Sequence, residues 1–209
     1  MPEEETSSHF VGISKGRMEG LSDGIFAFAM TLLVLGIAIP PIQGTPLPID
    51  LDDILFSLTT GFIHYVIAFL ILSGMWVSHH YLTDKMPHTD RNFLRLNMLV
   101  LLFIALIPFS TLLVGDFSGV PLANIVFEAN LLIVGGIIAT QWWYITRNPF
   151  LLRDGITAEY MRTGIYKALV TPAISVIGIL LSVGGMAYTT WVYLFVPLGI
   201  YLAGKAAQK

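Results

Sequence analysis

The chain has 209 residues, of which 55% are hydrophobic and only 12% are charged, and it contains no cysteine. Soluble globular domains carry about a quarter charged residues, so most of this surface must face lipid rather than water. The formal net charge is −3, which leaves no basic surface for the phosphates of a nucleic acid. Without cysteine, disulfides, thiolate metal sites and cysteine nucleophiles are excluded. We therefore expect a membrane protein that does not bind nucleic acid.

The N-terminal stretch MPEEETSSHFVGISKG is acidic and then amphipathic. It lacks the basic start, apolar core and small-residue cleavage site of a signal peptide. We expect residues 1–16 to form a retained cytoplasmic segment and residues 17–209 to form one membrane domain.

Uncharged stretches long enough to cross roughly 30 Å of hydrocarbon recur along the chain. The second of them is expected to continue as a helix beyond Trp76, into VSHHYLTDK. The sequence therefore predicts an all-α, polytopic membrane protein with six transmembrane helices. These spans lie near residues 20–39, 54–78, 96–115, 120–146, 165–185 and 188–204.

Segments rich in helix-breaking residues separate the predicted spans. PPIQGTPLPID at 40–50 prevents the first span from continuing, because proline removes a backbone donor and clashes with the preceding turn. The other breaks are GDFSGVP at 115–121, NPFLLRDG at 148–155 and VGGMAYTT at 183–190.

Lysine and arginine residues give the orientation of the protein in the membrane. All eleven lie before the first span, after the second, after the fourth, or at the C-terminal end. Because basic side chains favour the cytoplasmic side, both termini are predicted to be cytoplasmic in a multi-pass protein of the cell membrane. The outer connections are then acidic, either as an ordinary solvated rim or as a device that concentrates cations. Their acidic residues are Asp50, Asp52, Asp53 and Asp116.

The stretch RMEGLSDGIFAF, residues 17–28, places charges at the mouth of the first span, where they are costly. Ser22 and Asp23 are expected to form hydrogen bonds with Arg17 or with a polar residue of another helix, in a network that is either structural or functional. At 100° per residue they point away from an almost apolar stripe, which faces either lipid, the protein core or a pore. The stripe contains Arg17, Leu21, Gly24, Phe28, Thr31, Leu32, Leu35 and Ile39.

A second polar cluster lies in WVSHHYLTDKMPHTDRNFLRLN, residues 76–97. Imidazole and carboxylate groups can ligate zinc or iron, but the spacing does not match HExxH, and adjacent histidines project about 100° apart on a helix. We therefore expect no metal site and no cofactor. A structural partnership is favoured instead, among His79, His80, Asp90, Arg91 and Asn97.

Other polar residues inside the predicted spans are expected to form hydrogen bonds between helices. They are His64, Asn124, Glu128, Asn130, Gln141 and Ser175, and Glu128 is near enough to the outer end for water to reach it. Neither a GxSxG elbow, nor a P-loop, nor a TVGYG carbonyl filter occurs in the chain. An enzyme is therefore not expected, and any ion selectivity must come from side chains.

Arg17 followed by LSD at 21–23 resembles the Arg-x-x-x-Phe-Ser-Asp signature of the transmembrane protein 175 family, the lysosomal potassium channels. The bacterial branch of this family consists of single six-helix chains. Leu21 stands where phenylalanine is usual, and Phe28 stands where leucine or isoleucine is usual. Further segments that resemble the family are DGIFAFAMTLLVL at 23–35, WVSHH at 76–80, LNMLVLLFIALIPFSTLLVG at 96–115 and QWWYITRN at 141–148.

The resemblance implies a homotetramer in the lipid bilayer, with the first helix of each subunit lining a central pore for potassium and other monovalent cations. Matched residue by residue, the constriction and selectivity positions are Phe28, Thr31 and Leu35, with Leu32 beside them. The signature residues Arg17, Leu21, Ser22 and Asp23 would pack the first helix against its neighbours.

We therefore expect a potassium-permeable, cation-selective channel with a hydrophobic constriction and a threonine layer. Two alternatives remain open. One is a proton-conducting or proton-coupled transporter that uses Asp23, His64, His79 and His80. The other is a membrane-embedded metalloenzyme.

Overall fold

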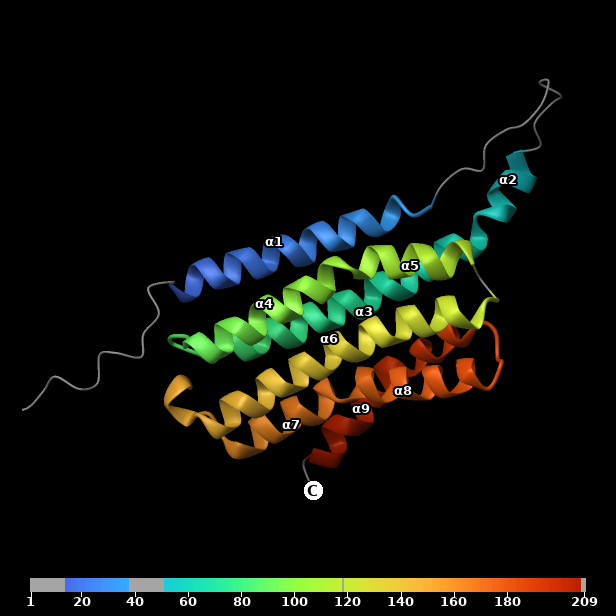
Figure 1. Cartoon of the computed structure of the whole chain (residues 1–209). Helices are drawn as coiled ribbons and strands as arrows, with labels where there is room; N and C mark the ends of the chain where they lie inside the picture. Colours follow the sequence, from blue (N-terminus) through green and yellow to red (C-terminus); the bar gives the residue numbers. More distant parts are fainter. Residues whose placement is uncertain (1–13, 38–50, 118, 208–209) are drawn as a thin grey trace, which may run out of the picture.

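The computed structural model describes residues 14–37, 51–117 and 119–207, and every regular element in these ranges is helical (Figure 1). The all-α prediction is confirmed for this part of the chain. The predicted break at 40–50 and most of the segment 1–16 lie outside the described residues. In chain order the α-helices are α1 (Lys15–Val34), α2 (Leu51–Ser57), α3 (Thr59–Asp84), α4 (Arg91–Ala105), α5 (Ile107–Asp116), α6 (Pro121–Arg147), α7 (Ala158–Ala168), α8 (Val170–Val183) and α9 (Val196–Ala207). Two 3₁₀ helices are η1 (Pro149–Leu151) and η2 (Thr189–Phe195).

Five helical stretches among the described residues are long and apolar enough to cross a membrane. Three of them join two elements, because the chain makes only a slight break between α4 and α5, between α7 and α8, and between η2 and α9. They correspond to the second to sixth predicted spans. The first predicted span, which α1 occupies, is not among them and remains a prediction, because α1 carries more charged residues than the other five. The five stretches are Thr59–Asp84, Arg91–Asp116, Pro121–Arg147, Ala158–Val183 and Thr189–Ala207.

The helices of the first and fifth predicted spans, α1 and α7, begin earlier in the chain than the sequence predicts. α1 starts at Lys15 rather than near residue 20, and its first two turns hold three charged side chains, those of Lys15, Arg17 and Glu19. α7 starts at Ala158 rather than at residue 165. The Thr157 hydroxyl caps this start by accepting a hydrogen bond from the backbone N–H of Tyr160 at 3.2 Å. Hydropathy misses such turns because a helix continues into the polar membrane interface, where charge is tolerated. By contrast, the predicted continuation beyond Trp76 is confirmed, since α3 reaches Asp84.

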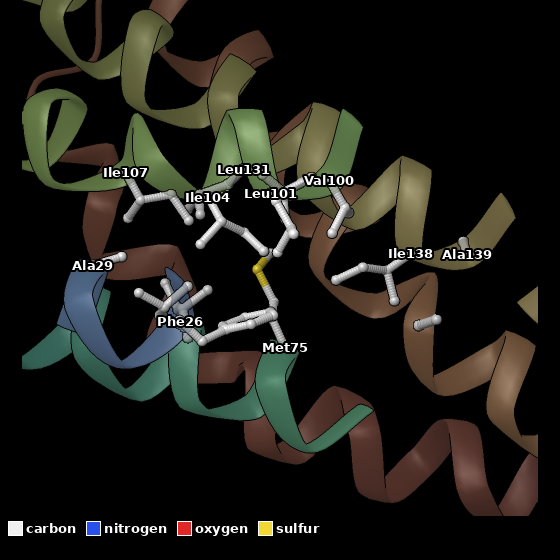
Figure 2. Close-up of a cluster of buried hydrophobic side chains, with 14 of the residues drawn as sticks. Phe26, Ala29, Met75, Val100, Leu101, Ile104, Ile107, Leu131, Ile138 and Ala139 are labelled. Carbon is white, nitrogen blue, oxygen red and sulfur yellow. The ribbon is translucent and has the colours of Figure 1, made fainter. Parts of the chain in front are cut away.

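The core lies where α1, α3, α4, α5 and α6 meet. Figure 2 shows Phe26 and Ala29 of α1 pointing toward Met75 of α3 and Ile104 of α4, with Leu131 of α6 behind them. Phe26, Ile104 and Leu131 have no exposed surface. Close packing of this kind is what holds membrane helices together, because lipid is as apolar as the side chains themselves.

The helices form one bundle in which α6 is central and α1 lies at an edge. Figure 1 shows α1 beside α4 and α5, with α7 and α9 on the opposite side of α6. The connections 85–90 and 148–157 lie at one end of the bundle, which we call the basic end because Lys85 and Arg153 are there. They meet directly, since the backbone N–H of Arg153 donates to the Lys85 carbonyl at 2.9 Å.

Only some of the predicted hydrogen bonds between helices are present. Ser175 bonds the Tyr193 hydroxyl at 2.9 Å, and the Asn130 amide lies 3.2 Å from the Ser110 hydroxyl. Among the described residues, however, the buried side-chain amides of Asn124 and Gln141 have no hydrogen-bond partner, so the prediction is wrong for these two.

Glu128 is not reached by water, contrary to the expectation from its position in the sequence. Its carboxyl group has no exposed surface and accepts bonds from the hydroxyls of Thr189 at 2.5 Å and Ser182 at 3.2 Å. Gly178 makes room for it, because a Cβ at that position would lie 2.6 Å from Glu128 Oε1. The residues after α8 fold back over α6 and close this end, which hydropathy cannot reveal.

Candidate functional site on the first helix

One face of α1 is buried against the rest of the chain. Its buried residues recur every three or four positions, as expected for one side of a helix. This face packs on α3, α4 and α5. Its residues are Met18, Ser22, Phe26, Ala29 and Leu33.

The opposite face of α1 is covered by no other residue in the described ranges, although its side chains are large and apolar. Phe28 is 64% exposed, and Leu35, at the C-terminal end of the helix, is 73% exposed. Thr31 is also exposed, whereas Leu32 is partly buried at the side of this face. Leu21, closer to the basic end, is 46% exposed. The structure thus places the predicted constriction residues on the uncovered side, apart from Leu32.

The Thr31 hydroxyl group is held by its own helix. It donates to the Phe28 carbonyl oxygen at 2.8 Å. Since a hydroxyl has one hydrogen and two lone pairs, the Thr31 oxygen can act toward any further partner only as an acceptor. An oxygen acceptor between two apolar side chains is suited to a cation that has lost part of its water shell.

A chain of hydrogen bonds ties α1 to α4 and α3. The Asn97 side chain donates to the Ser22 hydroxyl at 3.0 Å, and Ser22 donates in turn to the Met18 carbonyl at 2.9 Å. His79 Nε2 lies 2.7 Å from Asn97 Oδ1, so that nitrogen carries the hydrogen. All three side chains are buried. They join three helices at one level of the bundle.

Asp23 has a different partner, which was not expected from the sequence. The indole N–H of Trp76 donates to Asp23 Oδ1 at 2.8 Å, and the His80 ring stacks on Trp76 with centroids 5.5 Å apart. Asp23 and His80 remain exposed. In the described part of the chain the Arg17 guanidinium makes no hydrogen bond and no ion pair, so the signature residues do not bond to one another directly.

Asp90 holds the start of α4. Its carboxylate accepts the backbone N–H of Phe93 at 2.8 Å as an N-cap, and it also accepts the hydroxyl of Tyr144 from α6 at 2.5 Å. The next residue, Arg91, is exposed. The sequence pattern alone did not identify Tyr144 or Trp76 as hydrogen-bond donors to these carboxylates. Each lies within one turn of a polar residue, and this position could have indicated a hydrogen-bonding role, since a buried indole or phenol needs a hydrogen-bond acceptor.

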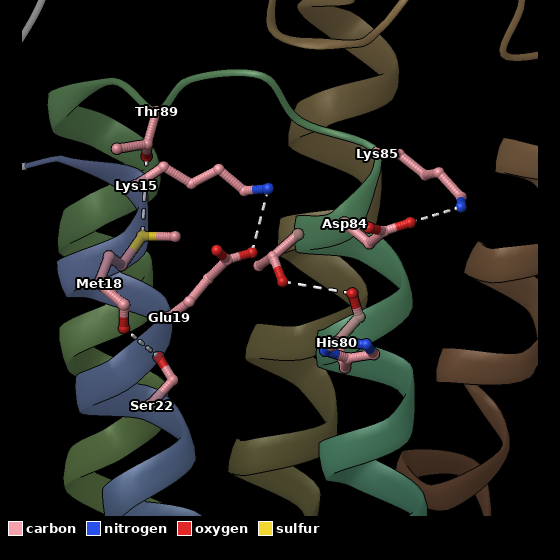
Figure 3. A network of polar contacts seen from close by, with 9 residues as sticks. Lys15, Met18, Glu19, Ser22, His80, Asp84, Lys85 and Thr89 are labelled. Atoms are coloured by element: carbon pink, nitrogen blue, oxygen red, sulfur yellow. Dashed lines mark hydrogen bonds and ion pairs between the residues drawn. The ribbon is translucent and has the colours of Figure 1, made fainter.

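Polar contacts continue to the basic end of the bundle (Figure 3). Lys15 pairs with Glu19 one turn later at 3.1 Å, and the Thr89 hydroxyl contacts Met18 Sδ at 3.8 Å. Lys85 lies 2.7 Å from the Asp84 carboxylate, and this hydrogen bond raises the pKa of the Lys85 ammonium group. Within the described ranges no three His, Asp or Glu side chains come together as a possible metal site.

Comparisons with known proteins identify the family. Residues 17–108, which include most of α1 and all of α2, α3 and α4, match the model of the family described as endosomal/lysosomal potassium channel TMEM175. A potassium channel of Streptomyces collinus is 34% identical over 70% of this chain and 72% of its own length. A potassium channel of Chamaesiphon minutus is 32% identical over 81% of this chain and 88% of its own.

The fold agrees with a solved structure of the same family. The crystal structure of a lysosomal potassium-selective channel TMEM175 homolog from Chamaesiphon minutus superposes with a TM-score of 0.66. It is 30% identical, and the match covers 89% of this chain and 97% of that one. Sequence and structure therefore agree that the chain belongs to the TMEM175 family, a family of ion channels and not of enzymes.

Proposed function

We propose that the chain forms a potassium-permeable, cation-selective channel in which α1 from each of four subunits lines a central pore. The observation that carries this proposal is the uncovered face of α1. It combines large apolar side chains with the exposed charged residue Arg17. Charged groups do not suit lipid, so this face must turn toward protein or water. The potassium channels among the relatives support the choice of ion.

Several copies are required, because the exposed stripe of one helix cannot enclose a pathway. Gly16, Gly20 and Gly24 follow one another at four-residue intervals on α1, and a Cβ at any of them would meet no other atom within 4 Å. Small residues at this spacing allow helices to approach closely. Four α1 helices can therefore pack around an axis at the basic end, and the number four is inferred from the family resemblance.

Side chains must perform the selection in such a pore. A ring of Phe28 side chains is apolar and uncharged, so it opposes conduction by excluding water. Thr31, one turn away, offers an acceptor oxygen from each subunit, and Leu35 adds a second apolar ring, with Leu32 behind it. Because potassium loses its water shell at lower cost than sodium, a narrow ring of this kind favours potassium, though less strictly than a carbonyl filter.

The residues of the predicted polar network are assigned a supporting role. The chain of bonds through Ser22, Asn97 and His79 fixes the rotation of α1 and therefore the direction of Phe28. Asp23 and Trp76 act in the same way closer to the surface. Arg17, Leu21, His80 and Asp90 complete the proposed motif, with Arg17 facing a neighbouring subunit or water.

The orientation follows from charge. The basic end is proposed to be cytoplasmic, because it holds Lys85 and Arg153. The other end of the bundle is acidic, with Asp52 and Asp53 at the start of α2 and Asp116 at the end of α5 (Figure 1). We assign this end to the outer mouth of the pore. Both termini are then cytoplasmic in the cell membrane.

A direct test uses purified protein in a planar bilayer with potassium on one side and sodium on the other. The expected result is a reversal potential displaced toward the potassium equilibrium value. A reversal potential of zero, or the absence of current from well-folded protein, would contradict the proposal. Current that instead follows an imposed pH gradient would favour the proton-conducting alternative.

The pore assignment can be tested separately, because the chain has no cysteine of its own. Leu35→Cys introduces one thiol on the proposed pore face, and a cationic thiol reagent should then block most of the current. Leu180→Cys is the matched control, since Leu180 is also largely exposed, at 66%, but lies on α8. Equal sensitivity of the two variants would show that α1 does not line the pathway.

A further inference from the structure

A groove of about 730 Å³ lies between α3, α6, α7 and α9, and no residue of α1 lines it. Its walls are apolar, with Ile71 and Met75 on one side and Ile138 and Ile200 on the others. Its volume lies within the range of about 300–1,000 Å³ found for small-molecule sites. The groove opens at the surface of the chain, where Leu70 is 62% exposed and Tyr81 is 55% exposed.

Small residues keep the groove open. A Cβ at Gly74 would meet no atom within 4 Å, so the space in front of this part of α3 is empty of protein. Gly164 on α7 has the opposite environment, because a Cβ there would lie 2.1 Å from the Trp142 ring. The Trp142 ring is fixed in turn by a bond from its indole N–H to the Ser78 hydroxyl at 3.1 Å. The wall of the groove at Trp142 and Gly164 is therefore tightly packed, while the space beside Gly74 is unfilled.

One charged side chain, that of Lys167, lines the groove. Lys167 lies seven residues further along α7 than Tyr160, about 10 Å at the rise of an α-helix, and the hydroxyl of Thr163 lies between them. The aromatic side chain of Tyr81 lines the groove from α3. The aliphatic part of Lys167 runs over Gly204, where a Cβ would lie 3.2 Å from Lys167 Cε. No acidic side chain in the described ranges pairs with Lys167. An unpaired lysine beside an apolar groove matches a negatively charged head on an apolar tail.

Two further basic side chains lie on or beside α7 without lining the groove. Lys85 lies 5.9 Å from the centre of the Tyr160 ring, although it is paired with Asp84. Arg162 donates to the Ala207 carbonyl and keeps its charge. The closest acidic residue on the same helix, Glu159, stands about 12 Å along α7 from Lys167.

The dimensions of the groove correspond to half of a bilayer. On α3 the lining runs from Leu70 to Tyr81, which is about 16 Å at the rise of an α-helix. One leaflet contributes about half of the roughly 30 Å hydrocarbon core. The end of the groove that Tyr81 and Tyr160 line is toward the basic end of the bundle, and the end at Leu70 is near the middle of α3.

We propose that this groove binds one acyl chain of an anionic phospholipid from the leaflet at the basic end, with the lipid phosphate bound by Lys167. The occupant is a lipid rather than a soluble ligand, because the groove opens sideways at membrane depth. It is anionic, because the single charged group that lines the groove is a lysine.

The test is native mass spectrometry of the purified assembly with added dioleoyl phosphatidylglycerol or dioleoyl phosphatidylcholine. The intact channel should bind phosphatidylglycerol about fivefold more tightly, which is the contribution of one lysine near an anionic lipid. Lys167→Gln should remove this preference and leave phosphatidylcholine binding unchanged. A wild-type protein without preference, or a preference that survives Lys167→Gln, would overturn the proposal.

A second variant tests the apolar part of the groove. Gly74→Leu places a side chain in the empty space and should lower the binding of both lipids at least fivefold. Gly136→Leu is the matched control, because a Cβ at Gly136 also meets nothing within 4 Å but Gly136 does not line the groove. Lipid binding that is unaffected by Gly74→Leu would place the lipid elsewhere, and a changed number of subunits would mean that a second copy covers the groove.

A measurement inside the groove decides the case if Gly74→Leu fails to fold. Phosphatidylglycerol with brominated acyl chains should quench the fluorescence of Trp142, seen as the difference between the wild type and Trp142→Phe. Excess glycerol phosphate should not reverse this quenching, because it has no acyl chain. Absence of quenching, or reversal by glycerol phosphate, would contradict binding of an acyl chain.

Discussion

α6 and α1 are both long helices of the bundle, yet they bury their surfaces in different ways. α6 is surrounded by α4, α5, α7 and α8, and its polar residue Glu128 is fully enclosed. α1 is covered on one side only, and its opposite side exposes Phe28 and Leu35. α6 is among the stretches apolar enough to cross a membrane, whereas α1 carries more charge, but neither property shows which side of a helix is left uncovered.

The contrast separates positions that stabilise the subunit from positions that are free to serve conduction. Around α6, a change of one methyl group must be absorbed by neighbours that are already in contact. On the open face of α1, the same change meets no other part of the chain. Substitutions should therefore affect folding at α6 and current at the open face of α1.

The largest effect is expected where α7 touches α6. Gly164→Ala would place a methyl group 2.1 Å from the Trp142 ring, and overpacking of this kind costs about 3 kcal/mol. The midpoint of thermal unfolding in detergent should fall by about 10 °C. Gly136→Ala, on α6 itself but with free space in front of it, should change the midpoint by less than about 2 °C. Similar midpoints for both variants would remove the distinction between packed and open glycines.

The next effect concerns the bonds that hold α1 to the bundle. Asn97→Leu leaves the buried His79 and Ser22 side chains without their shared partner, which costs about 1–2 kcal/mol. Thermal unfolding should report this loss, and the current should become smaller or less uniform as α1 rotates. Asn92→Leu, at an exposed position of the same helix, serves as the control. If Asn97→Leu is as stable as Asn92→Leu, the hydrogen-bonded chain does not stabilise the packing of α1.

Phe28→Ala should alter conduction with little change in stability. Removing an apolar ring from a constriction lowers the barrier to water, so single-channel current should rise at least twofold. The midpoint of unfolding should move by less than about 2 °C, because Phe28 is 64% exposed in the subunit. Phe195→Ala, equally exposed at 64% but on the far side of the bundle, should leave the current unchanged. A lack of any difference between the two variants would mean that the exposed face of α1 is not the pathway.

The smallest effect is expected at Thr31. Thr31→Val keeps the shape of the side chain but removes the acceptor oxygen, so the potassium preference over sodium should fall about twofold, or roughly 0.4 kcal/mol. The reversal potential under potassium and sodium gradients measures this change. Thr31→Ser retains the hydroxyl and should preserve the preference. A Val variant that selects as well as the wild type would assign selectivity to the apolar rings alone.

Much of the fold was accessible from the sequence, since five of the predicted spans correspond to helices that can cross a membrane. The location of most helix breaks also followed from proline and glycine chemistry. The starts of α1 and α7 were missed, because charged turns outside the hydrocarbon can still be helical. The environment of Glu128 was missed as well, since Thr189 reaches it from a segment 61 residues further along the chain.

The candidate site divides in the same way. Periodicity placed Phe28 and Leu35 on one side of a helix and Ser22 on another, because an α-helix turns by a constant angle per residue. It did not say which side would be uncovered, and only the packing of α3, α4 and α5 against α1 decided that. Trp76 as the partner of Asp23, Asn97 as the bridge between Ser22 and His79, and the groove beside Lys167 all arise from contacts between distant segments. Composition and charge thus established a helical membrane protein, whereas the open face and the groove depend on how the helices fit together in three dimensions.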